Sequence, residues 1–99
     1  MSTSNAEKIL LMRESERINR KKFSELVGVP YSSVSSYEHG RKEMGLSVAK
    51  KIFSHPRFQK YTLWFFTDQI APEAGQIAPA LAHYGQEDKE SVPLQKNAG

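Results

Sequence analysis

Cations and hydroxyl groups cluster in one stretch of the chain, where they could bind a charged partner. Residues 31–37 include four serines and two tyrosines, with basic side chains before them at 20–22 and after them at 39–42. Residues 1–60 hold 12 Lys or Arg against 6 Asp or Glu, a net charge of +6, whereas residues 61–99 carry a net charge of −3. This asymmetry favours a polyanion as the partner of the first part of the chain.

Catalytic and metal-binding chemistry finds no support in the residue pattern. The chain has no cysteine, which excludes disulfides, thiolate zinc sites and cysteine nucleophiles. Its three histidines, His39, His55 and His83, lack the spacing of metal ligands, and neither a glycine-rich phosphate loop nor a nucleophile elbow is present. We therefore expect a protein that is not an enzyme and that needs no cofactor or metal.

The length and the hydropathy pattern favour a single soluble domain. A chain of 99 residues is a normal size for one domain. The N-terminal residues MSTSNAEK show no basic-then-apolar signal pattern, and no apolar run approaches the roughly 20 residues needed to cross a bilayer. We expect a cytoplasmic protein, since the lack of cysteine fits a reducing compartment.

Capping residues and apolar spacing predict two helices in the first part of the chain. The first helix is expected over residues 4–17, with Ser4 as its N-cap. The second is expected over Arg20–Val27, with Asn19 as its N-cap and Gly28 as the left-handed residue that ends it. The immediate change from apolar periodicity to glycine predicts a tight turn after the second helix.

A third helix is expected directly after that turn. Pro30 suits the opening turn of a helix, because its missing N–H is not needed there, and Gly40 ends the helix expected over Tyr31–His39. Two short helices joined by a glycine-containing turn of about four residues form a helix-turn-helix pattern. The sequence therefore predicts a helix-turn-helix over about residues 19–40.

The following part is predicted to hold a fourth helix, Leu46–Phe53, and an aromatic fifth helix, about Pro56–Asp68. Six of the ten aromatic residues fall between Phe53 and Phe66. Because one helical face can cover the core, an excess apolar face could bind a second copy of the chain. The alternative is that the aromatic residues are only core. The residues assigned to a homodimer interface are Phe58, Tyr61, Trp64 and Phe65.

The composition divides the chain near residue 70. Residues 1–70 are expected to form the helical domain, and residues 71–99 an extension rich in Ala, Pro and Gly. A short helix could cover Gln76–Tyr84, although Pro79 interrupts it. The polar residues from Gly85 onward are expected to be disordered.

The segment from Ile18 to Phe53 resembles the Cro and phage-repressor type of helix-turn-helix, also called the XRE family. The resemblance covers about half of the chain and implies an all-α, five-helix, lambda-repressor-like DNA-binding domain. The matching positions are Ile18 and Asn19 before the second helix, Phe23 and Ser24 within it, Gly28 and Val29 in the turn, Val34 in the third helix, Tyr37–Lys42 at its end, and Leu46 and Ile52 in the fourth helix.

The resemblance implies that the third helix binds the major groove of double-stranded DNA. It also implies an ion pair between Arg13 and Glu38. The positions that match base-reading residues, or stand beside them, are Tyr31, Ser32, Ser33, Ser35 and Ser36. The positions assigned to phosphate binding are Asn19, Arg20, Lys21, Lys22, His39, Arg41 and Lys42.

The third helix departs from the family pattern in one respect. Its face, YSSVSSY, lacks the Arg, Gln and Asn side chains that make bidentate contacts with bases. We therefore expect sequence specificity to depend strongly on DNA shape. The alternative is that this helix only packs and that its serines are solvated surface.

These observations together favour a prophage-type repressor that binds a palindromic operator as a homodimer. One alternative is the antitoxin of a toxin–antitoxin pair, in which the acidic segment after Ile70 would bind a toxin. A second alternative is an interaction domain that has lost DNA binding. Arg20, Arg41 and Lys42 argue against the second alternative, because nothing else explains basic residues at these positions.

Overall fold

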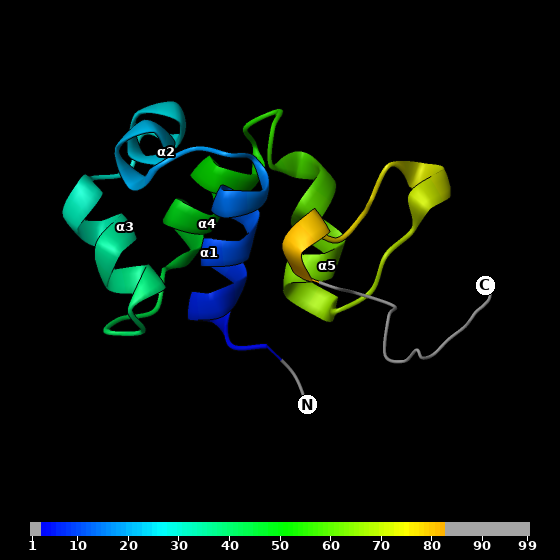
Figure 1. Cartoon of the computed structure of the whole chain (residues 1–99), viewed down its shortest axis with the longest axis horizontal. Helices are drawn as coiled ribbons and strands as arrows, with labels where there is room; N and C mark the ends of the chain where they lie inside the picture. The colour runs from blue at the N-terminus through cyan, green and yellow to red at the C-terminus, as the bar shows by residue number, and fades with distance from the viewer. Residues whose placement is uncertain (1–2, 83–99) are drawn as a thin grey trace.

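The structure is a computed structural model that describes residues 3–82, and in this range the chain is helical (Figure 1). This confirms the expected all-α class for the described part. None of the helices between residues 3 and 82 is long and apolar enough to cross a membrane. The helices are α1 (Asn5–Ser15), α2 (Arg20–Val27), α3 (Tyr31–Glu38), α4 (Leu46–Phe53) and α5 (Thr62–Thr67), with short 3-10 helices η1 (Gln59–Tyr61), η2 (Pro72–Ala74) and η3 (Ala80–Ala82).

Local capping signals set the ends of the first helices. The Ser4 hydroxyl accepts the N–H of Glu7 at 3.1 Å, and the Asn19 side chain accepts the N–H of Lys22 at 2.8 Å. Gly28 has φ +70°, and its N–H donates to the carbonyl of Ser24 at 3.0 Å. A side chain at this position would carry the steric cost of a left-handed backbone. The three residues 28–30 therefore turn the chain sharply from α2 into α3.

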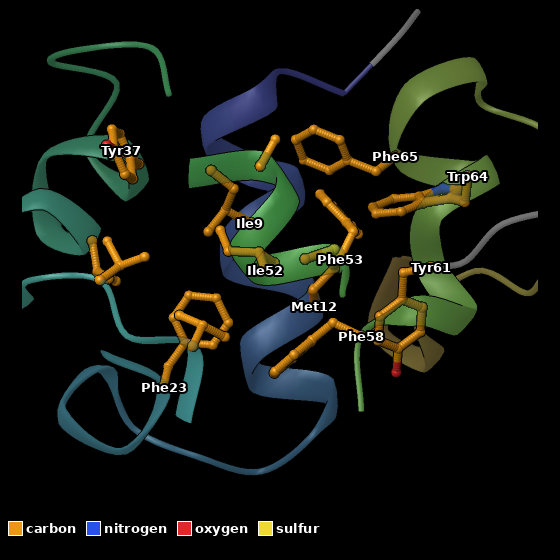
Figure 2. Close-up of a cluster of buried hydrophobic side chains, with 14 residues drawn as sticks. Ile9, Met12, Phe23, Tyr37, Ile52, Phe53, Phe58, Tyr61, Trp64 and Phe65 are labelled. Atoms are coloured by element: carbon orange, nitrogen blue, oxygen red, sulfur yellow. The ribbon is translucent and has the colours of Figure 1, made fainter. Parts of the chain in front are cut away.

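One hydrophobic core connects all five α-helices (Figure 2). Its members are Ile9, Met12, Phe23, Val27, Val29, Val34, Tyr37, Ala49, Ile52, Phe53, Phe58, Tyr61, Trp64 and Phe65. Phe23 of α2 meets Phe58 edge to face, with ring centroids 5.0 Å apart. Each fully buried large side chain stabilises the fold by about 1.5–3 kcal/mol. The core therefore fixes α2 and α3 on α1 and α4.

The predicted fifth helix is wrong in its extent, because residues 56–61 form turns and one 3-10 helix before α5 begins. A 3-10 helix has three residues per turn, so residues three apart point the same way. This lets Phe58 and Tyr61 both reach the core, and Trp64 reaches it from α5. Together with Phe65 they are 0–6% exposed. The prediction that these four side chains form a dimer surface is therefore corrected: they are core.

The segment from residue 71 to 82 also differs from the expected separate extension. The Gln76 side chain accepts the N–H of Leu63 at 2.9 Å and donates to the carbonyl of Gln59 at 3.0 Å. Pro79 is fully buried, and η3 packs against α1. The folded domain therefore continues beyond residue 70 to at least residue 82.

Only part of the predicted helix at Gln76–Tyr84 can be compared with the structure. Within residues 76–82, the helical residues are one 3-10 turn, Ala80–Ala82, placed directly after Pro79. The rest of that helix and the predicted disordered tail lie at residues 83–99, outside the described residues.

Candidate nucleic-acid interface

Helix α3 lies at one end of the long axis of the molecule, packed against α1 and α2 (Figure 1). Its inner face buries Val34 and Tyr37 in the core. Its outer face presents Tyr31, which is 50% exposed, and Ser32, also exposed. The three other candidate base-reading residues are half-buried and complete the set: Ser33, Ser35 and Ser36. The structure therefore brings all five candidates together on one helix.

A shallow hollow of about 370 Å³ opens beside the start of α3. It joins residues from three helices that are distant in sequence, and its charged lining residues are all cations. The N-terminus of α2, whose free N–H groups favour an anion, lies at this hollow. Its lining residues are Arg13, Asn19, Arg20, Lys21 and Tyr31. This arrangement is suited to bind a phosphate group.

A second group of cations follows the end of α3. Gly40, with φ +72°, turns the chain so that the N–H of Arg41 returns to the carbonyl of Ser36 at 2.9 Å. Arg41 and Lys42 are exposed. His39 Nδ1 lies 2.7 Å from the carbonyl oxygen of Ser35. Because a carbonyl only accepts hydrogen bonds, Nδ1 carries the proton and Nε2 faces away from this bond.

Glu38 joins two arginines in a buried ion-pair network. Arg13 donates to both carboxylate oxygens of Glu38, from Nε at 2.7 Å and from Nη2 at 3.1 Å. Arg13 Nη1 also donates to the carbonyl of Ile18 at 2.8 Å. The pair implied by the family resemblance is therefore present, and it has the bidentate geometry that makes such pairs strong. It connects α1 to the end of α3.

Arg20 is the second arginine on Glu38, with Nε 2.8 Å from Oε1. Its hydrogen bonds with Glu38 and then with Tyr31 raise the pKa of Arg20. The family resemblance implied only a phosphate contact for Arg20, and neither of these two partners was predicted. Its place one residue after the Asn19 cap gives no local signal of them, because Glu38 and Tyr31 come close only once α2 and α3 have packed.

The structure thus gathers the predicted site residues at the two ends of α3. Asn19, Arg20 and Lys21 line the hollow at its start, and Lys22 is exposed on the same helix, α2. The cations of residues 39–42 lie at its end. Arg13, assigned only to an ion pair, is an additional member of the hollow.

The fold and the site together define a class: a small protein, helical throughout residues 3–82, with cations at both ends of one helix that is partly exposed. The particular family follows from sequence identity. The chain is 54% identical to Repressor protein C of Escherichia phage P2, over 99 residues that make up 100% of both chains. It belongs to this phage repressor family. No family model matches the chain. A repressor relative gives no support to the antitoxin alternative.

Proposed function

We propose that this repressor binds double-stranded DNA in a sequence-specific way, with α3 in the major groove and the lambda-repressor-like helix arrangement that the family resemblance implies. The observation that carries the proposal is the exposed, hydroxyl-bearing face of α3 with cations at both ends. The width of the major groove admits one α-helix. The protein would then act as a regulator of transcription and not as an enzyme, on DNA in the bacterial cytoplasm.

One group of side chains would bind DNA phosphates, and a second group would contact base edges. Arg20 and Lys21 at one end of α3, and Arg41 and Lys42 at the other, would hold phosphates and so fix the helix in the groove. Tyr31 and the serines would face base edges. Serine can both donate and accept, so it discriminates poorly between bases. Sequence-dependent DNA shape would then supply much of the specificity.

The short length of α3 supports a homodimer on the operator. Eight residues at about 1.5 Å each make a helix of about 12 Å, which spans about four base pairs at about 3.4 Å per pair. Such a short contact gives little affinity and little specificity. Two copies related by a two-fold axis would read two half-sites, and the expected operator is a palindrome.

Selection from random duplexes, followed by a salt titration of the selected site, tests this function. A dimer that neutralises about eight phosphates should give a slope of log affinity against log salt near −7. Arg41→Ala should weaken binding to all sequences alike and flatten the slope, whereas Ser36→Ala should change which sequences are selected. No retention of any duplex at low salt would contradict DNA binding. Selected half-sites in the same orientation would contradict the palindrome.

A further inference from the structure

Tyr31 differs from the other exposed residues of α3, because its side chain alone presents a large apolar surface. It is the first residue of the helix and is 50% exposed. Val34, Tyr37 and Glu38 are buried, and the remaining four of the eight residues in α3 are serines. Within α3, which the structure describes in full, the ring of Tyr31 is therefore the one group that could gain much from an apolar contact.

Hydrogen bonds fix the position of the Tyr31 side chain. Its hydroxyl is hydrogen-bonded to the guanidinium of Arg20, and both residues line the hollow at the start of α3. Arg20 Nε donates to Oε1 of Glu38 at 2.8 Å, and Arg13 donates to both oxygens of the same carboxylate. The side chain of Glu38 is 1% exposed. A chain of hydrogen bonds therefore connects a buried carboxylate to the hydroxyl of Tyr31 and restricts where its ring can lie.

The hollow places this ring beside the cations that are proposed to bind phosphate. With a phosphate on Arg20 and Lys21, the ring of Tyr31 would lie just inside the edge of the major groove. The apolar group that the groove offers there is the 5-methyl group of a pyrimidine, which projects on the side of the base nearest its own sugar–phosphate strand. Thymine always carries this methyl group, and cytosine carries it when methylated at C5. An aromatic ring suits this position, because both apolar surfaces leave water on contact.

We propose that the ring of Tyr31 selects a pyrimidine with a 5-methyl group, thymine or 5-methylcytosine, at one position of each half-site. The proposal rests on the DNA binding by α3 proposed above and names the chemical group that the helix recognises. The serines of α3 cannot make this selection through their hydroxyls, because a methyl group neither donates nor accepts a hydrogen bond. Tyr31 then has two separable roles: its hydroxyl holds Arg20, and its ring contacts the methyl group.

Removal of single methyl groups from the DNA tests the contact. The probe is the duplex that the wild type selects from random sequences, with each thymine replaced in turn by uracil, which lacks only the 5-methyl group. We expect one position in each half-site where this change raises the dissociation constant about fourfold, the effect of one buried methyl group, and about 15-fold when both half-sites carry it. With cytosine at that position, 5-methylation should tighten binding about fourfold per half-site.

Two substitutions of Tyr31 separate the role of the ring from that of the hydroxyl. Tyr31→Phe keeps the ring and loses the hydrogen bond with Arg20, so it should weaken binding to the thymine and uracil duplexes alike and leave their ratio as in wild type. Tyr31→Ala removes the ring, so the ratio of the two dissociation constants should fall to about one at that position. Circular dichroism should show unchanged helicity in both variants, because Tyr31 is half exposed at the start of α3.

The possible failures of this experiment can be told apart. A wild type that binds its selected duplex but shows no position sensitive to uracil would overturn the methyl contact and leave DNA binding standing. Sensitivity to uracil that persists in Tyr31→Ala would also overturn it, because another side chain would then contact the methyl group. Equal binding of cytosine and 5-methylcytosine would overturn the contact with 5-methylcytosine and restrict it to thymine. Failure to retain any duplex at low salt would overturn both the contact and the proposed function.

Discussion

The Nε atom of Arg20 lies 2.8 Å from Oε1 of Glu38, which anchors the first residue of α2 to the last residue of α3. Glu38 also accepts two hydrogen bonds from Arg13, so one carboxylate binds two guanidinium groups. The cluster therefore carries one positive charge in excess. A DNA phosphate in the hollow beside Arg20 would balance that charge, and Glu38 and Tyr31 would hold the Arg20 guanidinium in position to bind it.

Arg20→Lys should weaken duplex binding about tenfold while leaving the salt slope almost unchanged. Lysine keeps the positive charge but cannot bond Glu38 and also offer two parallel donors to a phosphate. Arg41→Lys is the matched control, because Arg41 lies in the exposed loop and its side chain has no hydrogen-bond or ion-pair partner among residues 3–82. Binding of a fixed 30-base-pair duplex at several salt concentrations measures both. Equal losses in the two variants would contradict the positioning of Arg20 by Glu38.

Arg13→Met should lower the free energy of unfolding by about 3 kcal/mol. The side chain of Glu38 is only 1% exposed and would lose its bidentate partner. Arg20 would remain on Glu38, so we expect the low end of the range for a broken buried pair. Urea unfolding followed by circular dichroism measures the change. The exposed Arg17→Met should shift stability by less than about 0.5 kcal/mol, and an Arg13→Met protein as stable as wild type would refute the role of the pair.

Lys8→Met should loosen the attachment of α5 to α1. The buried Lys8 ammonium donates to the carbonyls of Trp64 at 3.2 Å and Phe65 at 2.8 Å, and lies 2.6 Å from Asp68 Oδ1. Methionine fills similar space but donates no hydrogen bond: the Trp64 carbonyl keeps the N–H of Asp68, whereas the Phe65 carbonyl loses the ammonium donor, at a cost of about 2 kcal/mol. Amide hydrogen exchange should speed up in α5. Lys22→Met, at an exposed position, should leave that exchange unchanged, and unchanged protection in Lys8→Met would contradict the prediction.

Glu16 should make the protein less stable in acid. Burial raises the pKa of Glu16, but hydrogen bonds from Lys60, Tyr61 and Arg57 together outweigh it and leave this pKa below its usual value. A lowered pKa in the folded state means that the stabilisation is present above the ordinary pKa and is lost as the pH falls through the lowered one. Urea unfolding from pH 7 down to about pH 3 should therefore show a smaller loss in Glu16→Gln than in wild type.

Glu14→Gln is the control for the acid dependence. Glu14 is exposed, and its side chain has no hydrogen-bond or ion-pair partner within the described residues 3–82. Its substitution should leave the dependence of stability on pH as in wild type. An identical acid profile in Glu16→Gln and wild type would show that the Glu16 network does not stabilise the fold.

Local signals in the sequence predicted the first four helices well. The bounds of α2 and α4 are as predicted, because a capping residue, a left-handed glycine or a loop residue marks each end. The Arg13–Glu38 pair was accessible only through the family resemblance, since the two residues are 25 positions apart. Arg20 as a second partner was not predictable, because the pairing depends on how α2 and α3 pack.

The region after α4 was predicted less well, for a physical reason. A regular helical period was applied to Pro56–Asp68, and it divided the aromatic residues between two faces. That period does not say which face covers the core, and in the structure it is the face of the four assigned dimer residues that is buried. The attachment of residues 71–82 depends on long-range contacts such as Gln76 to Leu63, which no local pattern encodes.

The chain has a single tryptophan, so its intrinsic fluorescence reports on one position. Trp64 is buried in α5, and its ring centroid lies 5.1 Å from the Lys8 ammonium. In Figure 1, α1 separates α5 from α3. Fluorescence emission from Trp64 should therefore change when α5 leaves α1 and stay constant when a duplex meets α3, so that unfolding and DNA binding can be followed separately in one sample.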